Sequence, residues 1–146
     1  MEGKEYTLTE FQEVAADFAQ KLTPGSGATV VALHGDLGAG KTTFVQNVAR
    51  ALGVQDDIIS PTFIIQKRYE LEGQKFARLV HVDAYRLESA HELEVLDWGD
   101  LVRDPANIVF IEWPENVEGL LDEAAHHVYF EYIDEDTRRI KYGKEN

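Results

Sequence analysis

The stretch Gly35-Asp36-Leu37-Gly38-Ala39-Gly40-Lys41-Thr42 matches G-x-x-x-x-G-K-[ST], the pattern of a phosphate-binding loop. Glycine permits backbone conformations that a side chain disfavours, so successive N–H groups can surround an anion at a helix N-terminus. Lys41 is expected to reach the β- and γ-phosphates of a nucleotide, and the Thr42 hydroxyl is expected to bind Mg²⁺. An accidental glycine-rich turn is the alternative interpretation.

The residues on both sides of this loop have the pattern that the motif requires. Residues 28–34 (Ala-Thr-Val-Val-Ala-Leu-His) form a short apolar run typical of a buried parallel strand. After the loop, apolar residues recur at helical spacing from Phe44 to Leu52, and Gly53 is suited to end that helix. A strand, a loop and a helix in this order favour nucleoside triphosphate binding.

Composition limits the class of protein. The chain has 146 residues, 44% of them hydrophobic, and a net charge of −13, which favours one folded domain over residues 1–146. The acidic balance argues against independent binding to nucleic acid or an anionic membrane. No cysteine is present for a disulfide or a thiolate site. With no secretory signal and no apolar stretch of transmembrane length, we expect a cytoplasmic protein.

The remaining pattern predicts helices and strands on both sides of the loop, and hence an α/β, P-loop NTPase-like fold with a mixed β-sheet flanked by helices. A basic cluster near the C-terminus is interpreted as the charges of a solvated edge strand; its members are Arg138, Arg139, Lys141 and Lys144. The other predicted elements are, in chain order, a Thr9-x-x-Gln12 capping box with a helix over 11–22, a hairpin over 62–85, a Ser89-x-x-Glu92 capping box with a short helix towards Gly99, a buried strand over 107–113, a short helix over 119–125, and a hairpin of strands 127–133 and 138–142.

Two acids are candidates to complete the site. Ile108 to Ile111 place Glu112 at the C-terminal end of a buried strand, the edge where ligands bind in open α/β sheets. A strand-end carboxylate facing solvent is the alternative. Asp83 shares one strand face with His81, and either His81 or Arg86 is a candidate partner for it. A functional carboxylate and a structural ion pair remain equally open for Asp83.

The segment Ser60-Pro61-Thr62-Phe63 lies between the loop helix and the predicted hairpin. Ser60 and Thr62 could sense a γ-phosphate, as switch segments do. The residues alone favour the alternative of a rigid turn at Pro61. Trp113 is, by residue type, more typical of core or edge packing than of catalysis.

Four segments, taken together and in order, resemble the TsaE (YjeE) family of bacterial ATPases required for threonylcarbamoyladenosine formation in tRNA. They are residues 35–43 (Gly-Asp-Leu-Gly-Ala-Gly-Lys-Thr-Thr), 60–63 (Ser-Pro-Thr-Phe), 81–87 (His-Val-Asp-Ala-Tyr-Arg-Leu) and 112–115 (Glu-Trp-Pro-Glu). The match runs from about Ala28 to Glu115. Each later motif is weak alone, whereas the ordered set is specific.

The resemblance implies ATP and Mg²⁺ as cofactors, slow hydrolysis by the chain alone, and work with the TsaD–TsaB pair that transfers the threonylcarbamoyl group to adenosine 37 of tRNA. It implies that Thr42 and Glu112 hold Mg²⁺, that Asp83 and Arg86 belong to the site, and that Trp113 lies near the nucleotide. It also implies that Ser60-Pro61-Thr62 is a switch segment. The family carries a Thr in the first-helix region that contacts the nucleotide. This chain has Phe11 there, with Thr9 nearby.

We therefore predict an ATPase of weak intrinsic activity that depends on partner proteins and meets tRNA only indirectly. A small-molecule P-loop kinase and a nucleotide-binding regulatory module are the alternatives. The predicted catalytic residues are Lys41, Asp83 and Glu112. The predicted cofactor-binding residues are Thr9, Asp36, Leu37, Gly38, Ala39, Gly40, Lys41, Thr42, Thr43 and Trp113.

Overall fold

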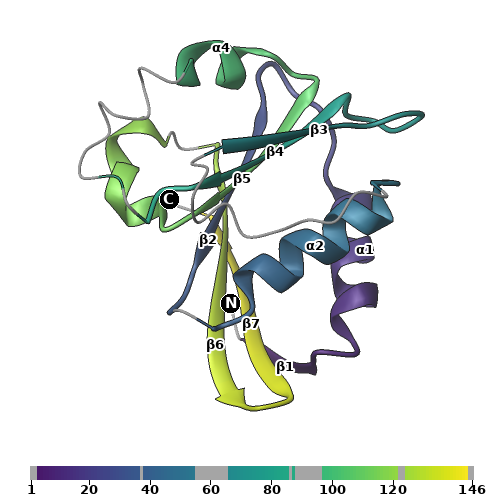
Figure 1. Cartoon of the computed structure of the whole chain (residues 1–146), viewed down its shortest axis with the longest axis vertical. Helices are drawn as coiled ribbons and strands as arrows, with labels where there is room; N and C mark the ends of the chain where they lie inside the picture. The colour runs from purple at the N-terminus through teal and green to yellow at the C-terminus, as the bar shows by residue number, and fades with distance from the viewer. Residues whose placement is uncertain are drawn as a thin grey trace.

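The computed structural model describes residues 3–36, 38–54, 66–85, 87, 97–121 and 124–144. Within these residues the strands form one seven-stranded sheet in the order β1-β7-β6-β2-β5-β4-β3 (Figure 1). The strands are β1 (Lys4–Thr7), β2 (Thr29–His34), β3 (Gln66–Glu70), β4 (Arg78–Asp83), β5 (Asn107–Glu112), β6 (His126–Asp134) and β7 (Thr137–Lys144).

The centre of the sheet is parallel and its flanks are antiparallel. β2 pairs in parallel with β5 and β6, and β5 pairs in parallel with β4. The pairs β3–β4, β6–β7 and β1–β7 are antiparallel. Every residue of β5 is buried, because this strand has a neighbour on each side and packed layers on both faces. The mixed sheet with flanking helices confirms the predicted fold class.

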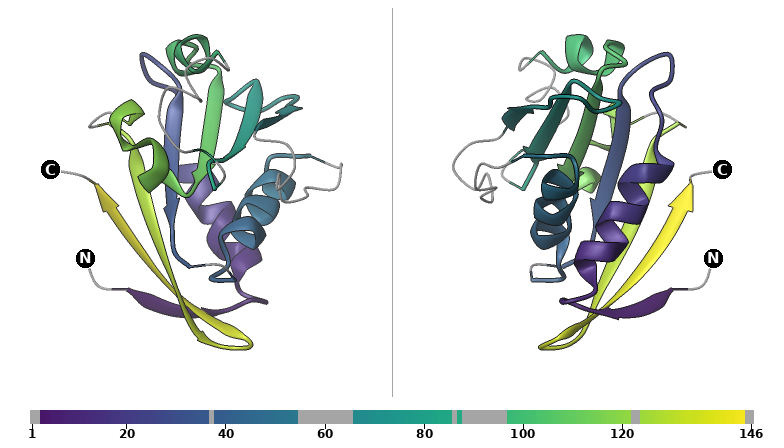
Figure 2. Two further views of the ribbon diagram at one scale, coloured as in Figure 1. Left: turned by 60° about the vertical axis from the view of Figure 1, so that its left-hand side comes forward. Right: turned by 90° about the vertical axis from the view of Figure 1, so that its right-hand side faces the viewer.

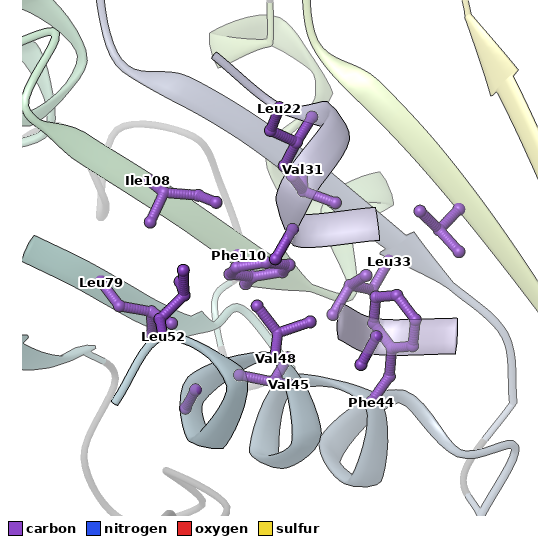
Figure 3. Close-up of a cluster of buried hydrophobic side chains, with 14 of the residues drawn as sticks. Leu22, Val31, Leu33, Phe44, Val45, Val48, Leu52, Leu79, Ile108 and Phe110 are labelled. Carbon is purple, nitrogen blue, oxygen red and sulfur yellow. The ribbon is translucent and has the colours of Figure 1, made fainter. Parts of the chain in front are cut away.

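Two helices cover one face of the sheet. α1 (Phe11–Lys21) and α2 (Lys41–Ala51) lie side by side there (Figure 2). Figure 3 shows the core beneath them, where Phe44, Val45 and Val48 of α2 meet Leu33 and Phe110 of the sheet. Truncating a buried phenylalanine in such a core to alanine costs about 3–5 kcal/mol. This packing fixes the N-terminus of α2 relative to the strand ends.

The opposite face is covered by shorter segments, α4 (Trp98–Arg103) and the 3₁₀ helix η1 (Pro114–Leu120). Trp98, Leu101 and Val117 pack there with Val80 and Ile111 of the sheet. Among the described residues, no helix combines the length and the apolar character needed to cross a membrane.

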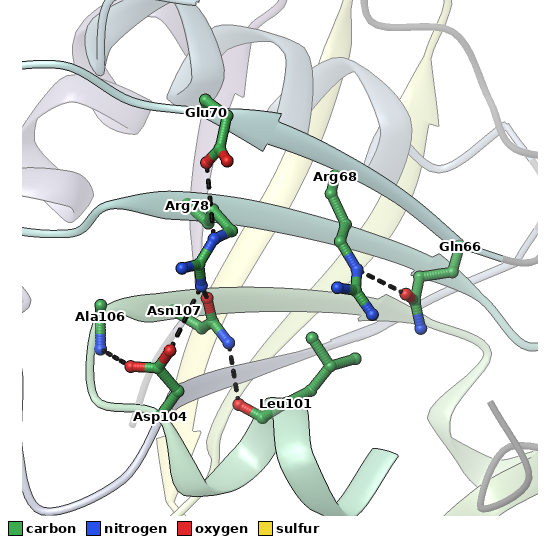
Figure 4. Close-up of polar contacts among 8 residues, drawn as sticks. All are labelled: Gln66, Arg68, Glu70, Arg78, Leu101, Asp104, Ala106 and Asn107. Atoms are coloured by element: carbon green, nitrogen blue, oxygen red, sulfur yellow. Dashed lines mark hydrogen bonds and ion pairs between the residues drawn. The ribbon is translucent and has the colours of Figure 1, made fainter. Parts of the chain in front are cut away.

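Arg78 ties the hairpin of β3 and β4 to the beginning of β5 (Figure 4). Its Nη1 donates to Asn107 Oδ1 at 2.6 Å and to Asp104 Oδ2 at 3.3 Å, and its Nε lies 3.5 Å from Glu70 Oε2. The Asn107 amide donates in turn to the Leu101 carbonyl at 3.0 Å. These contacts anchor the N-terminal end of β5, whose other end carries Glu112.

The end of α2 and the long hairpins agree with the sequence-based predictions. Val54 N–H donates to the Ala49 carbonyl at 2.9 Å, and Gly53 N–H donates to the Arg50 carbonyl at 3.0 Å. Gly53 has a φ of 89°, so this is the left-handed helix end that favours glycine. The hairpin predicted over 62–85 is seen as β3 and β4, and its first residues lie outside the described part. The predicted capping box at Ser89 also lies outside it.

The capping box was predicted two residues too late. Thr7 N–H donates to Glu10 Oε1 at 2.8 Å, and Glu10 N–H donates to Thr7 Oγ1 at 3.2 Å. This reciprocal pair opens the turn before α1, which begins at Phe11. Thr9 and Gln12 fit the same sequence pattern, but α1 has no side-chain cap at its own N-cap residue, Glu10.

The structure corrects two further expectations. The strand that carries the basic cluster is covered at Arg138 and Arg139 and is not an edge there, because the short and mostly exposed β1 pairs with Thr137–Ile140. The helical turn expected over 119–125 lies earlier, over Pro114–Leu120, since proline favours a first helical turn. The helix predicted from Ser89 towards Gly99 lies mostly outside the described residues, and Gly99 itself lies inside α4.

Candidate nucleotide-binding site

The phosphate loop connects the end of β2 to the start of α2 at the C-terminal edge of the sheet. Gly40 precedes α2 with a φ of 107°, a left-handed conformation that favours glycine. A Cβ at Gly35 would lie 2.7 Å from the Phe130 carbonyl oxygen, so the loop also needs glycine where it leaves the sheet. The backbone thus brings the N–H groups of α2's first turn to the strand ends.

Lys41 is buried at the first position of α2. Its Nζ donates to the Gly35 carbonyl at 2.6 Å and lies 3.7 Å from the centre of the Trp113 ring. Burial lowers the pKa of the Lys41 ammonium, and the nearby carboxylates, Glu112 foremost, oppose that shift. An ammonium has three N–H donors, so Lys41 keeps donors for an anion besides the one given to Gly35.

Glu112 ends β5 beside both Leu33 of β2 and Asp83 of β4. The Thr42 hydroxyl donates to its carboxylate, with distances of 3.0 and 3.2 Å to the two oxygens. The other contact is with His81, whose Nε2 lies 2.6 Å from Glu112 Oε2 and whose side chain is fully buried. A buried carboxylate is thereby held against the hydroxyl that was predicted to bind Mg²⁺.

Asp83 lies next to Glu112, and within the described residues its hydrogen-bond partner is the Tyr85 backbone. Its Oδ1 accepts the Tyr85 N–H at 2.9 Å, whereas His81 contacts Glu112. Burial raises the pKa of the Asp83 carboxyl, and the Tyr85 hydrogen bond opposes that shift. His81, one of the two candidate partners of Asp83, therefore contacts Glu112 instead. Arg86, the other candidate, lies outside the described residues.

These side chains share one cavity of about 360 Å³ at the loop. Its lining residues are Leu8, Gly38, Gly40, Lys41, Thr42, Thr43, Asp83, Tyr85, Glu112, Trp113 and Arg138. The structure thus brings together eight of the predicted site residues.

The other predicted site residues are not among the described residues of this cavity lining. Asp36 lies close enough to Lys41 to raise the pKa of its ammonium. Ala39 is buried in the core, and Thr9 is exposed in the turn before α1, where its neighbour Leu8 lines the cavity instead. Leu37, Ser60 and Thr62 lie outside the described residues.

Sequence reasoning missed Leu8, Tyr85 and Arg138. Leu8 and Arg138 come from the two ends of the chain, and the pairing of β1 with β7 brings them to the loop. Leu8 N–H donates to the Asp136 carbonyl at 2.9 Å. No local spacing signals such a long-range approach. Tyr85 lies within the family-like segment 81–87 and packs against Trp113, with ring centres 5.1 Å apart and the rings tilted by 52°.

The donor set around Thr42 fits a hard divalent cation. Magnesium prefers oxygen ligands and is commonly held by one or two carboxylates together with substrate phosphates and water. Glu112 and Thr42 offer a carboxylate and a hydroxyl beside the loop. In the described part of the chain there is no group of three or more His, Asp or Glu side chains suited to a metal held by protein alone.

Comparison with known proteins identifies one family in both the family-model match and the named relatives. The family described as "Threonylcarbamoyl adenosine biosynthesis protein TsaE" matches residues 6–140. Proteins named "tRNA threonylcarbamoyladenosine biosynthesis protein TsaE" from Haemophilus influenzae and Rickettsia prowazekii are each 35% identical, over 94% of this chain and 83% and 90% of their own lengths. One from Synechocystis is 42% identical over 70% of this chain and 62% of its own length.

A solved structure has the same fold. It is described as "Crystal structure of Bacillus subtilus YdiB", and it matches 97% of this chain and 86% of its own with a TM-score of 0.69 and 25% identity. The family match spans most of the chain and includes both the phosphate loop and the carboxylates that line its cavity. This chain belongs to the TsaE family.

Proposed function

We propose that this chain is a Mg²⁺-dependent ATPase that supports threonylcarbamoyl transfer to adenosine 37 of tRNA, in concert with the TsaD–TsaB pair. The relatives' names point to threonylcarbamoyladenosine biosynthesis. The observation that carries the ATPase assignment is the convergence of Lys41, Thr42 and Glu112 at the phosphate loop.

The geometry supports a distinct role for each of these side chains. Bound Mg²⁺ would neutralise charge that develops on the β- and γ-phosphates. Thr42 and Glu112 would hold that ion, and His81 fixes the direction of the Glu112 carboxylate. Lys41 would exchange its contact with Gly35 for the phosphates.

Asp83 is the candidate for handling the attacking water. Its carboxyl lines the same cavity, and burial raises its pKa, which makes the ionised form a better proton acceptor than an exposed aspartate. Trp113 covers the Lys41 ammonium from a backbone with a φ of 58°, which is uncommon for a bulky residue and concentrates at functional sites. The contact of Thr9 with the base and the switch role of Ser60 and Thr62 remain predictions.

The fate of radiolabelled ATP separates this function from its alternatives. Free phosphate, released faster when TsaD–TsaB is added, is the expected product. A labelled small acceptor would instead show a kinase, and unchanged ATP would show a binding module.

Glu112→Gln tests the site itself. The substitution keeps size and hydrogen bonding but removes the charge that should hold Mg²⁺. We expect hydrolysis to fall at least about tenfold, which corresponds to 1.36 kcal/mol of transition-state stabilisation, and its Mg²⁺ dependence to weaken. Glu131→Gln, on an exposed part of β6, is the matched control. Normal turnover by Glu112→Gln in the presence of the partners would make Glu112 a structural residue.

A further inference from the structure

Arg138 reaches the phosphate loop from the opposite end of the chain. This residue is only 8% exposed and lines the cavity that also contains Lys41 and Thr42. The guanidinium Nε donates to the Gly38 carbonyl at 3.2 Å. The stem of the side chain packs on Gly40, where an added Cβ would lie 3.4 Å from Arg138 Cγ. The hairpin of β6 and β7 thus places a cation at the loop.

The other contacts of Arg138 engage Nη1 and the face of the guanidinium without balancing its charge. Nη1 donates to the carbonyls of Asp134 at 2.6 Å and Thr137 at 3.0 Å, and the guanidinium carbon lies 4.6 Å from the centre of the Tyr132 ring. Among the described residues, no carboxylate lies within 4.0 Å of Arg138. A buried charge is costly unless it is paired.

The neighbouring arginine shows how unusual it is for a buried arginine here to lack a counter-ion. Arg139 is more exposed and pairs with both Glu5 at 3.0 Å and Glu131 at 2.6 Å. The whole chain carries 27 acidic residues against 14 lysines and arginines, so counter-ions are plentiful. The buried arginine at the loop nevertheless has none in the described residues, while the more exposed arginine beside it has two.

We propose that Arg138 is a second cationic phosphate ligand, which takes its counter-ion from the anion bound at the loop. The inference rests on the proposed function and adds a residue to it. A phosphate fits better than a carboxylate, because the cavity already contains the helix N-terminus and Lys41, and a guanidinium binds phosphate oxygens with two parallel hydrogen bonds. Nη2 has no hydrogen bond within the described residues and is available for that contact.

The test compares Arg138→Gln with Arg139→Gln, its neighbour on the same strand. Calorimetric titrations use MgATP and inorganic tripolyphosphate as probes. Arg138→Gln should weaken both affinities by about tenfold or more, which equals about 1.4 kcal/mol, and Arg139→Gln should leave both unchanged. Tripolyphosphate has no base or ribose, so a loss of its affinity reports lost contacts with phosphate groups alone.

Two results would overturn the proposal. Unchanged tripolyphosphate affinity in Arg138→Gln would mean that Arg138 does not bind phosphate, whatever happens to ATP. A wild-type chain that binds neither probe would instead remove the proposed function, and this inference with it.

A measurement on the wild-type chain guards against a variant that does not fold. The side-chain ¹⁵Nε signal of Arg138, assigned by its loss in Arg138→Lys, should shift when tripolyphosphate is added, and the signal of Arg139 should not. Equal shifts, or none for Arg138, contradict a direct phosphate contact.

Discussion

At the scale of single residues, Lys41 is a buried cation that a bound anion would stabilise. Its ammonium is buried against a backbone carbonyl and an aromatic ring, and burial lowers its pKa despite four nearby acids. A bound triphosphate would supply hydrogen bonds with charged acceptors, worth about 1.5–3 kcal/mol each.

Lys41→Ala should therefore weaken ATP binding by at least about tenfold. Calorimetry on the folded variant checks this, with Lys67→Ala on the exposed strand β3 as the matched control. Wild-type affinity in Lys41→Ala would be incompatible with a functional phosphate loop.

The raised pKa of Asp83 predicts how the stability of the fold depends on pH. Because burial raises its pKa in the folded chain, its carboxyl is protonated in both states below the unfolded value of about 3.9. As the pH rises through the folded-state pKa, the buried group must ionise, and the folded state loses stability relative to the unfolded one. Asp83→Asn lacks this loss and keeps an oxygen for the Tyr85 N–H.

Asp83→Asn should therefore be more stable than the wild type at pH 7, and the difference should vanish near pH 4. Urea unfolding across that range measures it. Asp104→Asn is an opposite-sign control: the Ala106 N–H and Arg78 lower the pKa of Asp104, so this variant should lose stability at pH 7 and recover in acid. A less stable Asp83→Asn at pH 7 would show that the ionised Asp83 carboxylate stabilises the fold.

At the scale of elements, local patterns were predictable and long-range pairing was not. The loop, α2 and β5 carry their own signals: glycine positions, helical spacing, and four consecutive apolar residues in a buried strand. Glu112 was placed correctly because the direction of β5 decides which end it occupies.

Other features depend on partners far away in the sequence. β1 has only four residues, three of them exposed, and is recognisable as a strand only from its pairing with β7. The same pairing turns Arg138 from an expected surface charge into a buried one at the loop. His81 was placed on the correct strand face, but its partner depended on the alignment of β4 with β5.

Two overlapping capping patterns precede α1, and substitutions can show which of them stabilises the fold. Thr7 exchanges hydrogen bonds with Glu10, whereas Thr9 has the same spacing to Gln12. Thr7→Ala should lower the free energy of unfolding by about 0.5–1 kcal/mol, the lower part of the range for lost caps, because the pair is exposed. Thr9→Ala should change it by less than about 0.5 kcal/mol. Urea denaturation of both variants decides between the patterns, and the reverse order would favour the Thr9 box.

At the scale of the whole molecule, charge limits what the chain can bind alone. The net charge is −13. Several arginines are already neutralised: Arg78, Arg103 and Arg139 each pair with aspartate or glutamate. Arg138 is buried at the loop. Phosphate contacts to RNA must come from lysine and arginine, and each such contact loses strength with salt.

The isolated chain should accordingly bind tRNA no better than a weak non-specific ligand, with Kd at or above about 10⁻⁴ M at physiological salt. An electrophoretic shift assay measures this, with the TsaD–TsaB pair added in a second series. That pair should raise ATP turnover and form a complex whose stability depends on the bound nucleotide, because the phosphate loop and its cavity are where this chain would sense ATP. Glu112→Gln controls for that dependence, since it should alter the Mg²⁺ site while leaving the acidic surface intact. Tight tRNA binding by the chain alone, or turnover unaffected by the pair, would favour an independent nucleotide-dependent enzyme.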